Sequence, residues 1–266
     1  MLQVDTMNSS LNARASHWLL WYTQLWDAQY STGSATLKRM LLRVGEDLPA
    51  LRGELLGEFG LAVSGAGNYE EGAACVDEGV RLAERCADDR LLGRVLSGLA
   101  LQRYLFFECR QAARAVERVV EKVGALPDMR WTVASSAWIR LYALSWLGRL
   151  DEVRASLDEY QTEAERLGHV GATWCLKHLR GMVAYMDGEF DRSLQHFEDA
   201  AAFARARQIP MLFHTSYNSS TVLHCIGRHE EAIVRAREAL QLERRRPRQP
   251  YGLFLRSSPD SAARGR

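Results

Sequence analysis

The residues of this sequence best suited to chemistry are histidines and cysteines that recur at short intervals in its second half. Cys175 and His178 are three residues apart, and His224, Cys225 and His229 make a second loose group. Imidazole and thiolate groups bind zinc, but neither group supplies four ligands at the spacing of a zinc site. We therefore expect no metal and attribute these residues to packing or to a solvent-facing helix surface.

Sequence motifs for catalysis are absent as well. The chain contains no G-x-x-x-x-G-K-[ST] phosphate loop, no G-x-G-x-x-G, no H-E-x-x-H and no G-x-S-x-G. Asp88 and Asp89 form a carboxylate pair, but adjacent residues on a helix point about 100° apart. We interpret them as the cap of a helix that begins near residue 90. The sequence predicts no catalytic residue, no cofactor and no enzyme activity.

The composition is that of a soluble helical protein with an uneven charge distribution. Of 266 residues, 47% are hydrophobic, 25% are charged and only 6 are proline, and the net charge is +1. Seven arginines against one aspartate give residues 244–266 a charge of +6, which leaves −5 on residues 1–243. We interpret 245–266 as a basic, disordered tail, the one part expected to contact nucleic acid.

A cytoplasmic location is favoured by two features. The aromatic segment Trp18–Trp26 lacks a strongly basic start and a small-residue cleavage site, so it is better interpreted as a helix face than as a signal peptide. Five dispersed cysteines without a C-x-x-C pair indicate reduced, buried thiols. No apolar run reaches the roughly 18 residues that a transmembrane helix needs, so we expect no membrane partner.

An internal repeat predicts the elements that position these residues. Five similar short segments are separated by 41, 40, 40 and 39 residues. They begin with Gly67, Glu108, Gly148, Gly188 and Gly227. Glycine supplies the left-handed conformation that ends a helix, and the acidic residues that follow favour the start of the next. Each segment is therefore predicted to join two helices.

This repeat predicts a map of the whole chain. First helices are expected near 48–66, 90–107, 129–147, 170–187 and 210–226, and second helices near 69–87, 109–124, 149–167, 189–207 and 228–244. Residues five and twelve past each turn are mostly small, which lets paired helices approach closely; in the second repeat these are Ala113 and Val120. Residues 1–47 are expected to hold a degenerate cap pair with its turn at Ser31–Ser34, residues 48–244 the five pairs, and residues 245–266 the tail.

The segment Gly67-Asn68-Tyr69-Glu70-Glu71, the run from Gly188 to Ala200 and the run from Gly227 to Ala239 resemble the tetratricopeptide repeat (TPR) signature. Their period near 40 resembles a longer-helix variant found in bacterial maltose-activator-type regulators and nucleotide cyclases. The resemblance implies an all-α, right-handed α-solenoid of stacked antiparallel helix pairs. It also implies a regulatory setting and a concave groove lined by the first helices.

Under this resemblance, groove residues lie thirteen, ten, six, three and two residues before each turn. From these positions in repeats three to five we predict the partner-binding residues Trp138, Tyr142, Trp146, His178, Tyr185, His214, Tyr217 and Thr221. In the second repeat the positions include Gln102 and Phe106. Aromatic side chains offer large contact areas at low entropic cost, which suits partner binding. Packing between repeats explains Trp138, Trp146 and Tyr185 equally well, so both interpretations stay open.

Three functions follow as hypotheses. The first is a non-catalytic binding module that recognises a protein or peptide in the concave groove. It would be a regulatory adaptor, or the effector- or partner-sensing part of a bacterial transcriptional or signalling regulator. The second is a small-molecule sensor with an aromatic pocket around Trp138, Tyr142 and Trp146. The third is an all-helical enzyme, which would need His178 or His214 beside a carboxylate. The sequence gives no indication of the oligomeric state.

Overall fold

A computed structural model describes residues 30–209 and 211–244 of the chain. These ranges form helices joined by short turns, without any strand. After α2 (Tyr30–Arg43), the first helices of the pairs are α3 (Pro49–Gly65), α5 (Asp89–Leu105), α7 (Arg130–Trp146), α9 (Val170–Met186) and α11 (Leu212–Cys225). Their partners are α4 (Tyr69–Arg85), α6 (Cys109–Val123), α8 (Leu150–Arg166), α10 (Phe190–Ala206) and α12 (His229–Arg244). A short 3₁₀ turn, Pro127–Met129, precedes α7.

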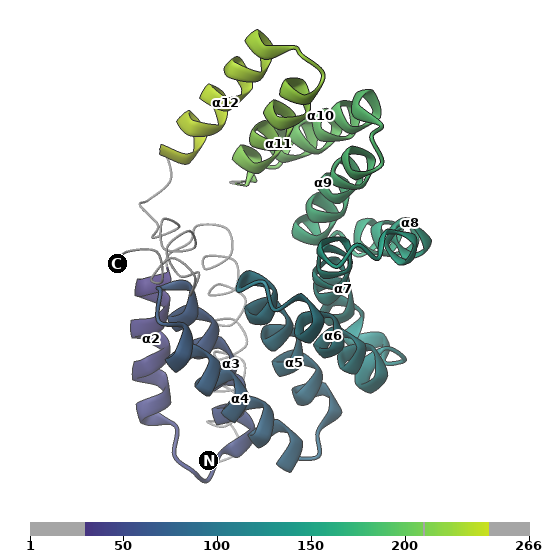
Figure 1. The fold of residues 1–266 in the computed structure, drawn as a ribbon. Coiled ribbons are helices and arrows are strands. Elements are labelled where there is room, and N and C mark those ends of the chain that lie inside the picture. The colour runs from purple at the N-terminus through teal and green to yellow at the C-terminus, as the bar shows by residue number, and fades with distance from the viewer. Residues whose placement is uncertain (1–29, 210, 245–266) are drawn as a thin grey trace, which may run out of the picture.

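The all-α solenoid of antiparallel helix pairs is confirmed. Each helix from α3 to α12 begins and ends within two residues of its predicted bounds. Successive pairs stack along an arc (Figure 1), with α5, α7 and α9 toward its inside and α6, α8 and α10 toward its outside. None of the described helices is both long and apolar enough to span a membrane. The predicted helix face Trp18–Trp26 and the basic tail lie outside the described residues.

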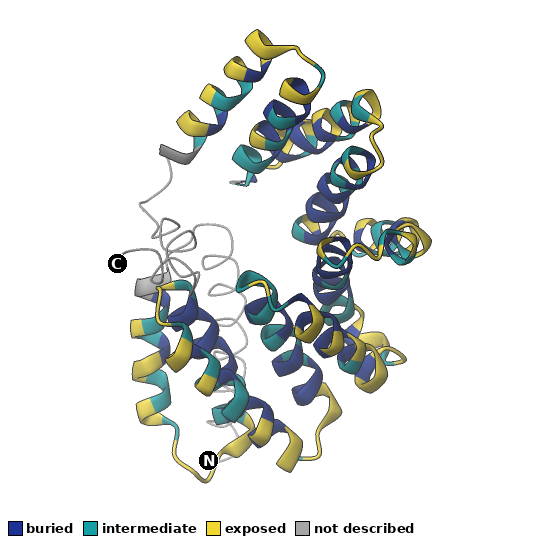
Figure 2. Cartoon of the chain, in the orientation of Figure 1, coloured by how far each residue is buried: buried dark blue, intermediate teal, exposed yellow. Residues whose placement is uncertain are grey.

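The two kinds of helix differ in how they are buried. The first helices α7 and α9 are buried on most sides, whereas the second helices expose their outward faces (Figure 2). A first helix contacts its own partner and the first helices of both neighbouring repeats, and so needs an apolar surface nearly all round. In α6, by contrast, the buried residues Ala112, Val116, Val119 and Val123 recur every three or four positions, on one face.

Glycines bring α3 and α4 into backbone contact. A Cβ atom at Gly60 would lie 2.4 Å from the Gly72 carbonyl oxygen, and one at Gly72 would lie 2.4 Å from the Gly60 carbonyl oxygen. Only glycine fits at both positions, since real Cβ contacts are never this short. In the fourth pair Ser193 replaces Gly72 and donates a hydrogen bond to the Gly181 carbonyl at 2.7 Å. The predicted close approach at the fifth residue past the turn is confirmed for these pairs.

The turn of the second repeat lies one residue earlier than predicted. Phe107 has a φ of +61° and takes the left-handed position, whereas Glu108 has a φ of −79° and precedes α6. In the other four repeats this position is held by Gly67, Gly148, Gly188 and Gly227. The prediction of Glu108 at the turn is wrong because this repeat lacks the glycine that marks it.

The small positions of the second repeat shift with its turn. Ala112 and Val119 are fully buried, whereas Val120, predicted at the second of these positions, is 41% exposed. The assignment of Ala113 and Val120 to the small positions is therefore also wrong by one residue.

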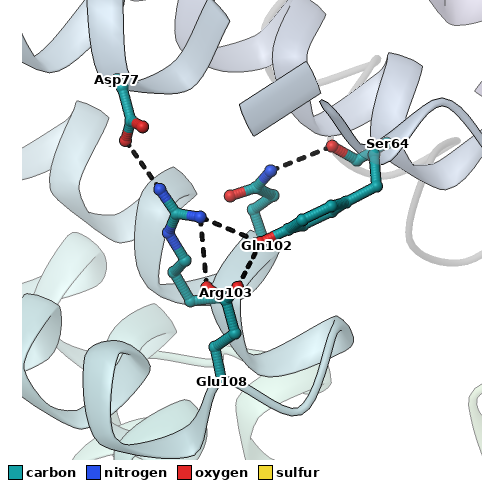
Figure 3. A network of polar contacts seen from close by, with 6 residues as sticks. Ser64, Asp77, Gln102, Arg103 and Glu108 are labelled. Carbon is teal, nitrogen blue, oxygen red and sulfur yellow. Dashed lines mark hydrogen bonds and ion pairs between the residues drawn. The ribbon is translucent and has the colours of Figure 1, made fainter. Parts of the chain in front are cut away.

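The groove positions predicted in the second repeat were counted from Glu108, so the shift of the turn to Phe107 affects them too. Gln102 is fully buried and donates a hydrogen bond to Ser64 Oγ at 3.1 Å (Figure 3). The Phe106 ring packs 4.2 Å from the ring of Tyr69. Both residues thus contribute to the contact between the first and second repeats.

The predicted turn at Ser31–Ser34 is wrong, because α2 runs through these residues without a break. Leu37 of α2 is 1% exposed and belongs to an apolar cluster with Leu55 and Phe59 of α3. This packing outweighs the weak helix preference of the Ser-Thr-Gly-Ser sequence. The rest of the predicted N-terminal pair falls before residue 30, outside the described residues, so the cap stays a prediction.

The interpretation of Asp88 as a helix cap is confirmed. Its Oδ1 atom accepts hydrogen bonds from the backbone amides of Arg90 and Leu91 at 2.9 and 3.2 Å. A side-chain oxygen at this position satisfies amides that have no partner within the helix. The carboxylate thus has a structural role at the start of α5.

Candidate partner-binding site

A chain of polar groups joins three successive first helices inside the solenoid. Asn218 Nδ2 of α11 lies 2.9 Å from His178 Nε2 of α9, and His178 Nδ1 lies 2.7 Å from the Tyr142 hydroxyl of α7. The Tyr142 hydroxyl donates to the Cys175 carbonyl at 3.0 Å. An amide nitrogen is a donor, so Nε2 accepts and Nδ1 carries the proton. Every group in the chain is then satisfied with a neutral histidine.

Burial keeps the side chains of His178 and Tyr142 in their neutral forms. It lowers the pKa of His178 to about 3, with a further contribution from the charge of His214. Burial also raises the pKa of Tyr142 well above its ordinary value. His178 is 4% exposed and stacks on Trp174, with 5.2 Å between ring centroids. Neither side chain exchanges a proton near neutral pH.

A cluster of aromatic rings lies beside this chain. The rings of Trp138, Tyr142 and Tyr104 are mutually 5.9 Å apart between centroids, in edge-to-face or tilted arrangements. Trp138 and Tyr142 are each 7% exposed. Of the eight predicted groove residues, Trp138, Tyr142 and His178 are therefore packed between first helices.

The other five predicted residues reach the surface. Trp146 is 51% exposed and Tyr217 is 61% exposed, whereas Tyr185, His214 and Thr221 are partly buried. The Tyr185 hydroxyl lies 3.6 Å from Cys225 Sγ. Of the eight predicted residues, three are therefore buried and five are at least partly exposed.

Phe107 is a surface aromatic residue that the repeat pattern of the sequence does not identify. Its ring is 66% exposed and makes an edge-to-face contact with Trp146, with 6.0 Å between centroids and 78° between planes. The similarity of the turn segments places the turn at Glu108 and so passes over Phe107. Counting 40 residues from Gly67 leads to Phe107 instead.

A polar network fixes the backbone around Phe107. Arg103 donates to Asp77 Oδ1 at 2.8 Å, to Glu108 Oε2 at 3.1 Å and to the Tyr69 hydroxyl at 3.0 Å. The Tyr69 hydroxyl also donates to Glu108. Figure 3 shows Arg103 between Asp77 and Glu108, which come from different repeats. These bonds fix the residue immediately after Phe107, and the contact of Phe106 with Tyr69 fixes the residue before it.

Two clefts flank α8 on the outside of the arc. One has a volume of about 360 Å³ and is lined by Arg154, Arg180 and Arg192 with carboxylates; the other, of about 490 Å³, lies between α7 and α8. Each arginine of the first cleft already pairs with a carboxylate. Because these charges are matched within the chain, we assign no ligand to the first cleft.

Cysteine and histidine residues form no group of three metal ligands within residues 30–209 and 211–244. All five cysteines are free. Cys109 and Cys175 are buried as expected. Cys75 and Cys86 are only half-buried and Cys225 is exposed, so these three depart from that expectation.

No protein-family model matches the chain, and no curated protein sequence matches it significantly. Solved structures do match. A structure of nearly identical TPR-like repeats from Podosopora anserina superposes with a TM-score of 0.57 and 13% identity, over 74% of this chain and 96% of that one. The fold is TPR-like. Because the identity is this low, the match establishes the fold and nothing further.

Two bacterial structures share the TPR-like fold over most of this chain. The Rap conjugation gene regulator of plasmid pLS20, in complex with the Phr* peptide, matches with a TM-score of 0.63 and 17% identity over 82% of this chain. Aspartyl phosphate phosphatase F from Bacillus subtilis matches with a TM-score of 0.63 and 11% identity over 85% of this chain. The matches cover 64% and 62% of those two chains, so about a third of each has no counterpart here.

Proposed function

We propose that this chain is a non-catalytic, cytoplasmic binding module that recognises a peptide or a peptide segment of a protein along the inside of its solenoid. The observation that carries the proposal is the exposure of large aromatic side chains on the first helices α7 and α11. Trp146 and Tyr217 are each more than half exposed, on helices whose other sides are packed. Exposed aromatic side chains of this kind are enriched at the centres of protein interfaces.

The solved neighbours support this proposal by analogy. The Rap regulator of plasmid pLS20 has the same fold and was solved with a bound peptide. A solenoid presents a long concave surface, which suits an extended ligand. Contacts from Trp146, Tyr185, His214, Tyr217 and Thr221 would then come from three successive repeats. Their buried neighbours Trp138, Tyr142 and His178 would hold the helices that carry them.

An enzymatic function is the less supported alternative. One neighbour is named a phosphatase, so the fold itself does not exclude catalysis. His178, however, hydrogen-bonds the neutral side chains of Tyr142 and Asn218, and burial lowers its pKa to about 3. A general base near neutral pH needs a pKa close to 7. His178 does not meet this requirement.

The small-molecule sensor also has weaker support. Its pocket was expected around Trp138, Tyr142 and Trp146, but the first two are buried against each other and against Tyr104. A ligand there would have to displace packed aromatic rings. The exposed side chain of Trp146 is open to a peptide without such a rearrangement.

Selection from a random peptide library displayed on phage, with the folded full chain as bait, tests the proposal. The affinity of a labelled selected peptide is then compared between the wild type and a Trp146→Ser, Tyr217→Ser double variant. Because both side chains are exposed, the variant should stay folded, and its affinity should fall about tenfold or more.

The matched control is an Ile233→Ser, Val234→Ser double variant on α12, where both side chains are exposed at 51% and 62%. It removes similar exposed apolar groups from a second helix and should bind the peptide as the wild type does. Failure to enrich any peptide, or equal affinity of the Trp146, Tyr217 variant, would overturn the proposed function.

A further inference from the structure

Phe107 occupies a backbone conformation that its residue type disfavours. Its φ of +61° lies in the left-handed region, which the four equivalent turns fill with glycine. A side chain with a Cβ atom is strained there, because the Cβ atom approaches the following carbonyl oxygen. Ala87 and Gln208 also adopt this conformation, at turns between repeats. Such strain persists where the surrounding structure over-determines it.

The Phe107 ring makes little packing contact that could offset this backbone strain. It is 66% exposed, and its aromatic contact is with Trp146, which is itself 51% exposed. An apolar ring that stabilised the fold would be buried, as Phe197 is at 1% exposure in α10. The fold therefore does not require a phenylalanine at this position.

The strain is held in place by the residues on either side. Phe106 packs on Tyr69, and Glu108 accepts hydrogen bonds from Arg103 and Tyr69. The Arg103 side chain is only 14% exposed, and it also bonds Asp77 of α4. Two repeats therefore cooperate to fix the turn, and the Phe107 ring is presented outward in a defined position before any partner arrives.

We propose that Phe107 is a specificity-determining residue that, with Trp146, binds one uncharged aromatic side chain of the partner peptide. This inference rests on the proposed function and adds a preference for a particular side chain. Two rings in an edge-to-face contact leave free faces and edges, on which a third ring can pack in the same geometry. Preorganisation of the turn lowers the ordering cost of binding.

The charges around the two rings argue for an uncharged occupant. Arg103 is paired with Asp77 and Glu108, and Arg149, which follows the turn after Trp146, is paired with Glu152. Arg103, Glu108 and Arg149, each within four residues of one of the two rings in the sequence, thus have their charges matched within the chain. A charged partner side chain would lose its hydration here without gaining an opposite charge.

Two substitutions of Phe107, to Gly and to Ala, separate its role in binding from any role in folding. Both remove the ring, but glycine also relieves the backbone strain. The Phe107→Gly chain should unfold at an unchanged temperature or up to about 3 °C higher. Peptides selected on the wild type should share an aromatic residue and should bind both variants about tenfold or more weakly.

Selection repeated on Phe107→Gly should lose the shared aromatic residue while still yielding peptides that depend on Tyr217. Val120→Ala, at an exposed position of α6, is the control and should change neither the unfolding temperature nor the affinity for the selected peptides.

Each contrary result has a distinct meaning. Wild-type peptides that bind Phe107→Gly with full affinity would overturn the role of Phe107 and leave the proposed function standing. Failure of the wild type to select any peptide would overturn both proposals. A fall of several degrees in the unfolding temperature of Phe107→Gly would assign the ring to the fold. Self-association of the wild type that Phe107→Gly abolishes would assign it to contact between copies of the chain.

Discussion

The Tyr142 hydroxyl of α7 lies 2.7 Å from Nδ1 of His178 of α9, inside the solenoid. The two residues are 36 positions apart in the sequence. Both residues were predicted to line a groove, and both instead join neighbouring repeats. Asn218 extends the connection to a third repeat, 40 residues beyond His178. One polar connection therefore runs across three repeats, directly behind the surface proposed to bind the partner.

Stability should fall steeply in mild acid because two buried histidines must stay neutral. Burial lowers the pKa of His169 to about 4 and that of His178 to about 3. The unfolded chain takes up these protons near its ordinary value of about 6.5, so stability is full above that pH and is lost as the pH falls toward 4. Each histidine should cost about 2 kcal/mol at pH 5.

Thermal unfolding of the wild type and of His178→Gln between about pH 7.5 and 5 measures this loss. The variant should show a shallower pH dependence, whereas His224→Gln, at an exposed position, should behave as the wild type does. Equal slopes for His178→Gln and the wild type would mean that His178 is not held neutral.

The same glycine-to-alanine change should have opposite effects at two positions. At Gly60 the added Cβ meets the Gly72 carbonyl at 2.4 Å, so Gly60→Ala should destabilise the chain by roughly 1–3 kcal/mol or more. Around Gly98, in α5, nothing lies within 4 Å, so Gly98→Ala should stabilise by roughly 0.5–1 kcal/mol. Urea unfolding of both variants checks the pair, and a shift of the same sign in both would contradict the backbone contact between α3 and α4.

Most of the fold was predictable because its determinants are local and repeat. Glycine turns such as Gly148 and Gly188 mark every 40 residues, and short side chains such as Ser193 recur at a fixed distance after them. The second repeat broke the prediction because Phe107 adopts the glycine conformation, held by contacts with the first repeat. Those contacts depend on tertiary structure, which a local pattern does not contain.

The site was less predictable than the fold for a related reason. Helical spacing indicates which residues share a face, but two positions on that face can differ completely in burial. Trp138 and Trp146 lie eight residues apart on α7, yet one is 7% exposed and the other 51% exposed. The difference arises because Trp138 lies against Tyr104 and Tyr142, whereas Trp146 lies at the end of the helix.

The corrected register of the second repeat makes a prediction that separates adjacent valines. Val119 is fully buried and Val120 is 41% exposed. Val119→Ala should lower the free energy of unfolding by roughly 1–3 kcal/mol, whereas Val120→Ala should change it by less than about 0.5 kcal/mol. Chemical denaturation of the two variants measures the difference, and a larger loss for Val120→Ala would restore the register with Glu108 at the turn.

Hydrogen–deuterium exchange of the full chain, with and without a peptide selected on it, tests the central claim of inner-face recognition most directly. Binding on the inner face should slow exchange in the last turns of α5, α7 and α9, where Trp146 ends α7, and along α11, which carries Tyr217. Slower exchange confined to α8 and α10, on the outside of the arc, would contradict it.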